Sequence, residues 1–339
     1  AEDDLLTEAL AVDGRRPGGF TNKVDPDIVA GMPSGQAVAV ILLRLLGMAE
    51  VNVPGVLADI DTEFLHDFRV AVRRTRAALK LFGGALGRPA VVTRFAAEFK
   101  WLGDVTTPTR DLDVHLLDFE DMTRRLKAAK PDDLEPFRDY LRGRRARGSR
   151  ALARSLRTPR YSELAREWRG TLTTLSDGVA AKQPKSPGAS AATLAAETTR
   201  KAFVKVVRMG SAITPDSPAE SLHDLRKRCK ELRYALEFFA PLYGPASYGR
   251  VVGDLKRLQD CLGTFQDNEV QIAEIRSLAT GMLAANETPA VTLLAMGEIA
   301  AGLADGQAVA RADFERRFGE FAGIGGRRRM SALLRGEAG

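Results

Sequence analysis

The stretch that decides the fold is His66-Asp-Phe-Arg69-Val-Ala-Val-Arg73-Arg-Thr-Arg76-Ala-Ala-Leu-Lys80-Leu-Phe82. It returns 157 residues later as His223-Asp-Leu-Arg226-Lys-Arg-Cys-Lys230-Glu-Leu-Arg233-Tyr-Ala-Leu-Glu237-Phe-Phe239. Both copies place His, Arg, Arg or Lys, and Arg at relative positions 0, 3, 7 and 10. In a helix these positions share one face, so each copy predicts a stripe of stacked cations. Two such stripes predict a site for a strongly anionic ligand.

The opposite face of each motif is apolar, which predicts that both helices pack against a core. Its residues are Phe68, Val72, Leu79 and Phe82 in the first copy and Leu225, Cys229, Leu232, Leu236 and Phe239 in the second. A solvated basic face on a surface helix is the simpler alternative. The histidine that returns in the same place argues against it, because a solvated face does not need one.

Composition favours an all-α protein with an anionic partner. The chain has 339 residues, 45% of them hydrophobic and 6% aromatic, which is enough for about two domains. Ala, Leu, Arg and Glu dominate the patterned stretches, and alternating strand patterns are missing. The net charge of +6 and the pI near 9.4 favour polyanions without choosing among them.

A second element repeats with nearly the same offset. Lys100-Trp-Leu-Gly-Asp104, followed by Asp111, matches Lys256-Arg-Leu-Gln-Asp260, followed by Asp267. The chain therefore reads as a tandem duplication of a unit of four or five helices. We expect a lead-in or tail of an upstream domain at 1–33, a first bundle at 34–180, a linker at 181–190, a second bundle at 191–322 and a flexible basic tail at 323–339.

Helix ends are expected wherever breakers interrupt the pattern. Thr106-Thr107-Pro108 predicts one break, and separate helices are expected at 246–261 and 267–285, and at 287–303 and 307–321. The chain begins at Ala1 without Met, which suggests a fragment of a longer protein or a processed form.

The paired H-D-x-R-x-x-x-[RK]-x-x-R motifs, each followed by K-x-L-x-D, resemble the CHAD family over roughly residues 34–320. The resemblance implies two four-helix bundles related by pseudo-two-fold symmetry around a central basic groove or pore. It also implies binding of inorganic polyphosphate and association with polyphosphate granules. Members often follow a CYTH triphosphatase domain, so this chain is expected to be the C-terminal part of such a protein, with that domain as a partner.

The resemblance assigns the motif residues to phosphate binding, and helical spacing adds further cations from neighbouring segments. The expected polyphosphate-binding residues are His66, Arg69, Arg73, Arg76, Lys80, Lys100, Lys201, Lys205, Arg208, His223, Arg226, Lys227, Lys230, Arg233, Tyr234 and Lys256. Guanidinium groups make bidentate contacts with phosphate, so a stripe of arginines can follow a polyphosphate chain. We expect tighter binding below about pH 6.5, because a polyanion favours protonated histidine.

Three alternatives remain. The His-Asp dipeptides are those of metal-dependent phosphohydrolases, but His115 is the only further histidine, so two complete sites cannot be built. A basic nucleic-acid-binding protein is permitted by charge, yet no recognition motif supports more than non-specific binding. A metal-chelating module is disfavoured by the arginines around each histidine.

We therefore expect no catalysis, no cofactor and no metal. Two cysteines, Cys229 and Cys261, fit a reducing compartment and a cytoplasmic location. The apolar run at 37–43 is too short to span a bilayer, so no membrane association is expected.

Overall fold

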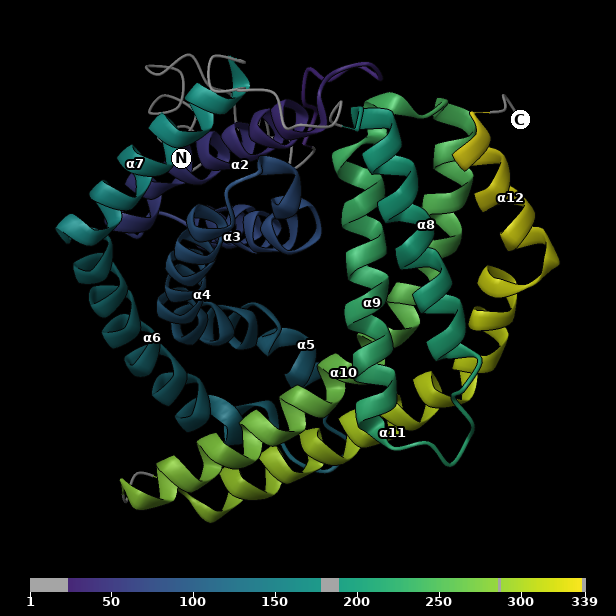
Figure 1. Ribbon diagram of the computed structural model, residues 1–339. Helices are drawn as coiled ribbons and strands as arrows, with labels where there is room; N and C mark the ends of the chain where they lie inside the picture. Colours follow the sequence, from purple (N-terminus) through teal and green to yellow (C-terminus); the bar gives the residue numbers. More distant parts are fainter. Residues whose placement is uncertain (1–23, 178–188, 286–287, 337–339) are drawn as a thin grey trace.

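The computed structural model describes residues 24–177, 189–285 and 288–336. All regular structure in these ranges is helical, apart from one isolated bridge between Pro33 and Ser190 (Figure 1). The all-α class expected from the sequence is confirmed.

Residues 24–177 of the first half form six helices and two short 3-10 turns. They are α2 (Ser34–Ala58), α3 (Thr62–Phe82), η1 (Gly83–Leu86), α4 (Pro89–Leu117), α5 (Phe119–Arg124), η2 (Pro131–Leu134), α6 (Glu135–Leu156) and α7 (Pro159–Ser176). The second half supplies longer helices. They are α8 (Ala191–Gly210), α9 (Ala219–Phe238), η3 (Ala240–Leu242), α10 (Pro245–Ala284), α11 (Ala290–Ala322) and α12 (Ile324–Arg335).

The two motifs form α3 and α9, and their apolar faces are buried as predicted. Helix α3 begins after Asp61, whose side chain accepts a hydrogen bond from the amide of Glu63 at 2.7 Å, an ordinary N-cap. Phe68 and Phe82 are almost completely buried in the first core, and Leu225 and Cys229 in the second. Burial of these faces turns the cationic stripe of each helix away from its own core.

Helix α2 lies at the centre of the first core. By length and composition alone it could cross a membrane, and half of the residues of that apolar stretch are buried inside the protein. It packs against α3 and α7, with Leu42 and Leu45 fully buried. These contacts identify it as a core helix.

A third core cluster joins the two halves of the chain. The far ends of α10 and α11 extend beyond the second core and run along the lower edge of the first half (Figure 1). There Ile275 and Met296 pack with Phe119 and Phe137, which belong to α5 and α6. Elements from both halves therefore hold one another in place around the centre of the molecule.

Several predicted helix boundaries are wrong. Helix α4 runs through Pro108, α10 joins the two helices expected at 246–261 and 267–285, and α11 joins those expected at 287–303 and 307–321. The tail expected to be flexible from residue 323 forms α12 instead. Its Met330 and Leu333 are buried against α10 and α11, which gives this helix an apolar face to pack.

The expected lead-in and linker lie partly outside the described residues, which omit 1–23 and 178–188. Of the described part of the lead-in, Val24 and Ile28 are buried in the first core. The amide of Ser34 donates to the carbonyl of Ala189 at 3.0 Å, so the start of α2 lies beside the start of α8.

Candidate functional site

The two motif helices, α3 and α9, contact one another at their C-terminal ends. At their C-terminal ends, the ring of Phe82 on α3 packs edge-on against Phe239 at a centroid distance of 5.1 Å. Two ion pairs cross the same interface: Arg74 with Glu237 at 3.3 Å and Lys80 with Glu231 at 2.6 Å. This contact fixes the position of one cationic stripe relative to the other.

A cavity of about 660 Å³ opens beside this interface, between α3 and α9. Helix α10 and the segment around α5 complete its wall (Figure 1). Its cationic lining residues are Arg73, Arg74, Arg125, Arg226, Lys230 and Arg233, and its acidic lining residues are Asp118, Asp121, Glu237, Asp260 and Asp267. The lining is therefore mixed in charge, and the pairing of these groups decides what it can bind.

Most of the carboxylates in the lining already have cationic partners. Glu237 pairs with Arg74 and Arg233, Asp260 with Lys256 at 3.1 Å, and Asp267 with Arg226 at 2.9 Å. By contrast, the ion pairs among the described residues include none to Arg73, Lys230 or Arg125. These three side chains therefore add positive charge to the cavity without forming an ion pair, although Asp118 also lines it and the charge of Asp267 acts on Lys230.

Arg73 and Lys230 occupy the same position, the eighth residue, of the two motif copies. Burial and the charges of Arg226 and Arg73 together lower the pKa of Lys230 to about 8, against the opposing charge of Asp267. The two equivalent cations therefore repel one another in the unliganded protein. An anion placed between them would remove that repulsion.

The first residues of the first motif contact α4 and do not line the cavity. Arg69 donates hydrogen bonds from Nη1 to the hydroxyls of Thr106 at 2.8 Å and Thr107 at 2.9 Å. Burial lowers the pKa of the neighbouring His66, as do the charges of Arg110 and Arg73. Burial and the surrounding cations thus disfavour protonation of His66 in the free protein.

In the second motif, the ring of His223 is hydrogen-bonded through Nδ1 to Oε1 of Gln266. Gln266 stands where the first half has Arg110 in the matching segment. Tyr234 lines the cavity while its ring stacks on Phe238 at a centroid distance of 5.9 Å.

The structure thus brings five of the expected residues to the cavity wall: Arg73, Arg226, Lys230, Arg233 and Tyr234. The others lie outside that lining: His66, Arg69, Arg76, Lys80, Lys100, Lys201, Lys205, Arg208, His223, Lys227 and Lys256. Lys201, Lys205 and Arg208 belong to α8, which packs against α9, and the side chain of Lys201 is 80% exposed. Lys100 and Lys256 instead form matching exposed pairs with Asp104 and Asp260, four residues on.

The motifs did not indicate every residue of the lining. Arg74 directly follows Arg73 but falls outside the repeated positions, and Arg125 follows α5 in a segment without a repeat signal. Gln259 and Gln271 add uncharged donors from α10. Only the fold brings these residues to the cavity, so helical spacing could not have found them.

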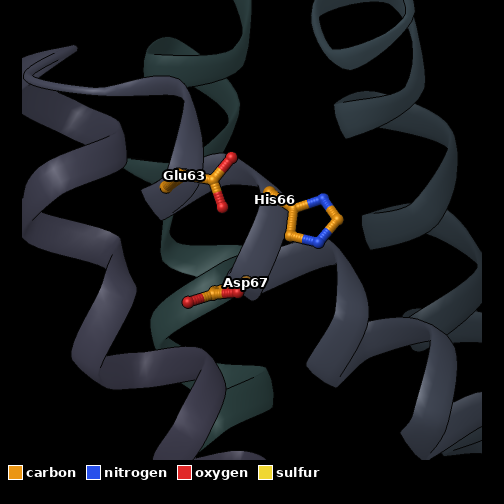
Figure 2. Close-up of side chains that lie close together, drawn as sticks. All are labelled: Glu63, His66 and Asp67. Atoms are coloured by element: carbon orange, nitrogen blue, oxygen red, sulfur yellow. The ribbon is translucent and has the colours of Figure 1, made fainter. Parts of the chain in front are cut away.

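One group near the cavity has the composition of a metal site. Glu63, His66 and Asp67 on α3 each offer a ligand atom, and these atoms lie within 4.8 Å of one another (Figure 2). From the sequence, no metal is expected here. The nearby Arg110 and Arg73, whose charges lower the pKa of His66, also oppose a divalent cation.

Comparisons with known proteins identify the fold. The structure is similar to the crystal structure of the CHAD domain from the plant Ricinus communis, with a TM-score of 0.74 and 26% identity over 90% of this chain and 96% of that one. It is also similar in fold to PptA from Streptomyces chartreusis, with a TM-score of 0.62 and 17% identity over 84% of this chain and 99% of that one. No curated protein sequence matches.

The CHAD domain family model matches residues 40–276, which include both motifs and the helices that surround the cavity. This match covers well over half of the chain. The chain therefore belongs to the CHAD domain family, a family generally associated with polyphosphate.

Proposed function

We propose that this protein binds inorganic polyphosphate without catalysis, in the cavity between α3 and α9. The observation that carries the proposal is the pair Arg73 and Lys230, two cations from equivalent motif positions that line one cavity without carboxylate partners. Lys230 is partly buried and Arg73 is exposed at the same cavity, so an anion bound between them would balance a charge that burial makes unfavourable. Polyphosphate, with about one negative charge per phosphate, is suited to that role.

The arrangement of the other cations supports the same ligand. Arg226 and Arg233 are held by Asp267 and Glu237, which orients their guanidinium groups along the cavity wall. Oriented guanidinium groups make bidentate contacts with phosphate oxygens at a smaller entropic cost than free ones. Tyr234 is the one aromatic residue of the lining, and its ring already stacks on Phe238, so the cavity offers no free platform for a base.

The finer architecture belongs to the proposal as well. We take the protein as two four-helix bundles that arose by tandem duplication and are related by pseudo-two-fold symmetry, with the basic groove between them. The matching Lys100–Asp104 and Lys256–Asp260 pairs support equivalent positions in the two halves. The binding would serve targeting to polyphosphate granules in the cytoplasm or delivery to an upstream CYTH domain.

A metal-dependent phosphohydrolase is the second candidate, because Glu63, His66 and Asp67 could ligate a cation. Phosphate release from polyphosphate in the presence of Mn²⁺ or Mg²⁺ tests it directly. Release that disappears in the His66→Ala variant would replace the non-catalytic proposal, and absence of release with intact binding would support it.

Binding of labelled long-chain polyphosphate over a series of salt concentrations, with duplex DNA as a competitor, tests the proposed ligand. We expect affinity to fall steeply with salt as counterions are released, and we expect DNA to compete weakly. Equal competition by DNA would favour non-specific nucleic-acid binding instead.

A further inference from the structure

The outer helix α6 carries a second concentration of positive charge, away from the two motifs. Residues 140–162 contain eight arginines and no Asp or Glu. Helix α6 lies at the periphery of the first half (Figure 1). Its buried face is formed by Leu141, Leu152 and Leu156, so its arginines are divided between that face and solvent.

Four of these arginines form an exposed stripe. Arg147, Arg150, Arg154 and Arg157 occupy relative positions 0, 3, 7 and 10, the same spacing as the cations of the two motifs. All four are exposed, and they lie opposite the buried leucines of the helix. The stripe is about 15 Å long, from the rise of an α-helix.

Three of the remaining arginines on α6 have carboxylate partners, whereas the guanidinium of Arg144 lies 5.8 Å from the ring centroid of Tyr140. Arg138 pairs with Glu135 at 3.4 Å, Arg142 with Asp139 at 3.3 Å, and Arg145 with the buried Asp113 at 2.8 Å. Among the described residues, no ion pair involves a member of the stripe. Like charges three and four residues apart repel one another, so the row is unfavourable unless an anion covers it.

The stripe begins at a second cavity. This cavity, of about 470 Å³, lies between α4, α6 and α10, and Arg144 and Arg147 line it together with His115 and Glu274. The ring of His115 is hydrogen-bonded to Glu274 at 2.7 Å, and Asp111 contributes a second carboxylate to this lining.

The two cavities are close neighbours along the same helices. Gln271 on α10 and Asp118 at the end of α4 line the first cavity, each three residues from Glu274 and His115 of the second. Three residues are nearly one helical turn, so about one turn separates the two cavities along α4 and α10. A chain that fills the first cavity can therefore reach the second and, beyond it, Arg147.

We propose that the α6 stripe binds the part of a long polyphosphate chain that leaves the central cavity. This inference rests on the proposed function, because the stripe is the continuation of the same binding path. Short chains would fill only the cavity, whereas long chains would contact both surfaces. The stripe thus makes the protein prefer long polyphosphate through additional contacts on one chain.

The chemistry of the surface favours this occupant over others. Within the described residues, no exposed large hydrophobic side chain lies on α6, so the helix lacks the apolar face that inserts into a membrane. Tyr140 and Tyr161 are the nearest tyrosines and both are partly buried, which leaves no stacking platform for nucleic-acid bases. What remains is a surface that recognises phosphate oxygens alone.

The test compares long-chain polyphosphate with tripolyphosphate on the Arg150→Glu/Arg154→Glu variant. Both positions lie outside the two cavities. Arg250→Glu/Arg328→Glu, which reverses two exposed arginines on α10 and α12, is the control with the same change in net charge. We expect the stripe variant to bind long chains about tenfold more weakly than the control, with tripolyphosphate binding equal in both.

Equal affinity of the stripe variant and the control for long chains would overturn the inference, while retained tripolyphosphate binding would leave the proposed function standing. If the Arg73→Ala/Lys230→Ala variant and the stripe variant both bind tripolyphosphate as tightly as the wild type, the central cavity is not the binding site. Duplex DNA and anionic vesicles are tested as competitors. If either displaces long polyphosphate from the wild type but not from the stripe variant, the stripe binds that competitor instead. Arg150→Ala/Arg154→Ala repeats the test without introduced carboxylates, and thermal unfolding verifies that each variant is folded.

Discussion

Arg73 and Lys230 occupy the same position of two copies of one helical motif, and they line the same cavity without an ion pair to a carboxylate among the described residues. The charge of Arg73 is one of the causes that lower the pKa of Lys230 to about 8, after burial and Arg226. Neighbouring arginines on the same helices differ, since Glu237 balances both Arg74 and Arg233. Equivalent positions of the two motifs thus bring two cations to one cavity, where a bound anion would balance their charges.

Removing one of these charges should stabilise the unliganded protein. In Lys230→Met the apolar stem is kept while the partly buried charge is lost, and we expect the free energy of unfolding to rise by about 1 kcal/mol. Lys227→Met is the matched control, because Lys227 is exposed and paired with Asp224, and its effect should stay within about 0.5 kcal/mol. Chemical denaturation measures both. Destabilisation by Lys230→Met would contradict the repulsion inferred here.

Polyphosphate affinity should fall as the pH rises above about 8. The pKa of Lys230 is about 8 in the free protein, and a bound polyanion raises it, so binding takes up a proton when the lysine is neutral. The affinity is therefore highest at pH values where Lys230 is charged in both the free and the bound protein. It falls as the pH rises through the pKa that Lys230 has in the free protein. Lys230→Arg should bind with nearly constant affinity from pH 7 to 9.5, because arginine stays charged. A wild-type profile as flat as that of the variant would refute this role of Lys230.

A second pH dependence should appear on the acidic side. Burial and the charges of Arg110 and Arg73 lower the pKa of His66, whereas a polyanion near Arg73 favours the protonated ring. Affinity should consequently rise by about two- to threefold as the pH falls from 7.5 to 5.5. Polyphosphate end groups titrate in the same range, so His66→Gln serves as the reference. Identical slopes for wild type and His66→Gln would show that the histidine does not contribute.

Arg145 should matter for stability and leave binding unchanged. Its guanidinium bonds Asp59 and Asp113, and the side chain of Asp113 is completely buried. Arg145→Ala leaves that carboxylate without its cation, and we expect a loss of about 3 kcal/mol in the free energy of unfolding. Arg142→Ala, which removes an exposed pair with Asp139, should cost less than about 0.5 kcal/mol. Similar losses for the two variants would contradict the structural role of Arg145.

The sequence predicted those features that depend on local periodicity. The all-α class, the helical state of both motifs and the burial of their apolar faces follow from residue spacing, and the structure confirms them. The role of Arg69 was different. Its position in the stripe predicted a ligand contact, whereas the side chain donates to Thr106 and Thr107 on α4, contacts that no helical wheel of α3 contains.

Helix ends were predicted poorly because tertiary contacts override local breakers. At Thr106-Thr107-Pro108 the hydroxyl of Thr107 donates to the carbonyl of Gly103 at 2.8 Å, and Arg69 on α3 also donates to that carbonyl, so tertiary contacts hold the helical turn that precedes Pro108. In α11 the glycine near the expected break at 303–307 is Gly306, and a methyl group there would approach the side chain of Asn268 on α10. Close packing between these two helices thus explains why the chain continues as one long helix.

Calorimetric titration with long-chain polyphosphate tests the central claim most directly. The wild type is compared with Arg73→Ala/Lys230→Ala and with Lys201→Ala/Lys205→Ala, which removes two lysines of α8 that lie outside the cavity. We predict tight binding by the wild type and the α8 variant, and a loss of affinity of about one hundredfold in the cavity variant. Equal affinity of all three proteins, or loss only in the α8 variant, would contradict a polyphosphate site between α3 and α9.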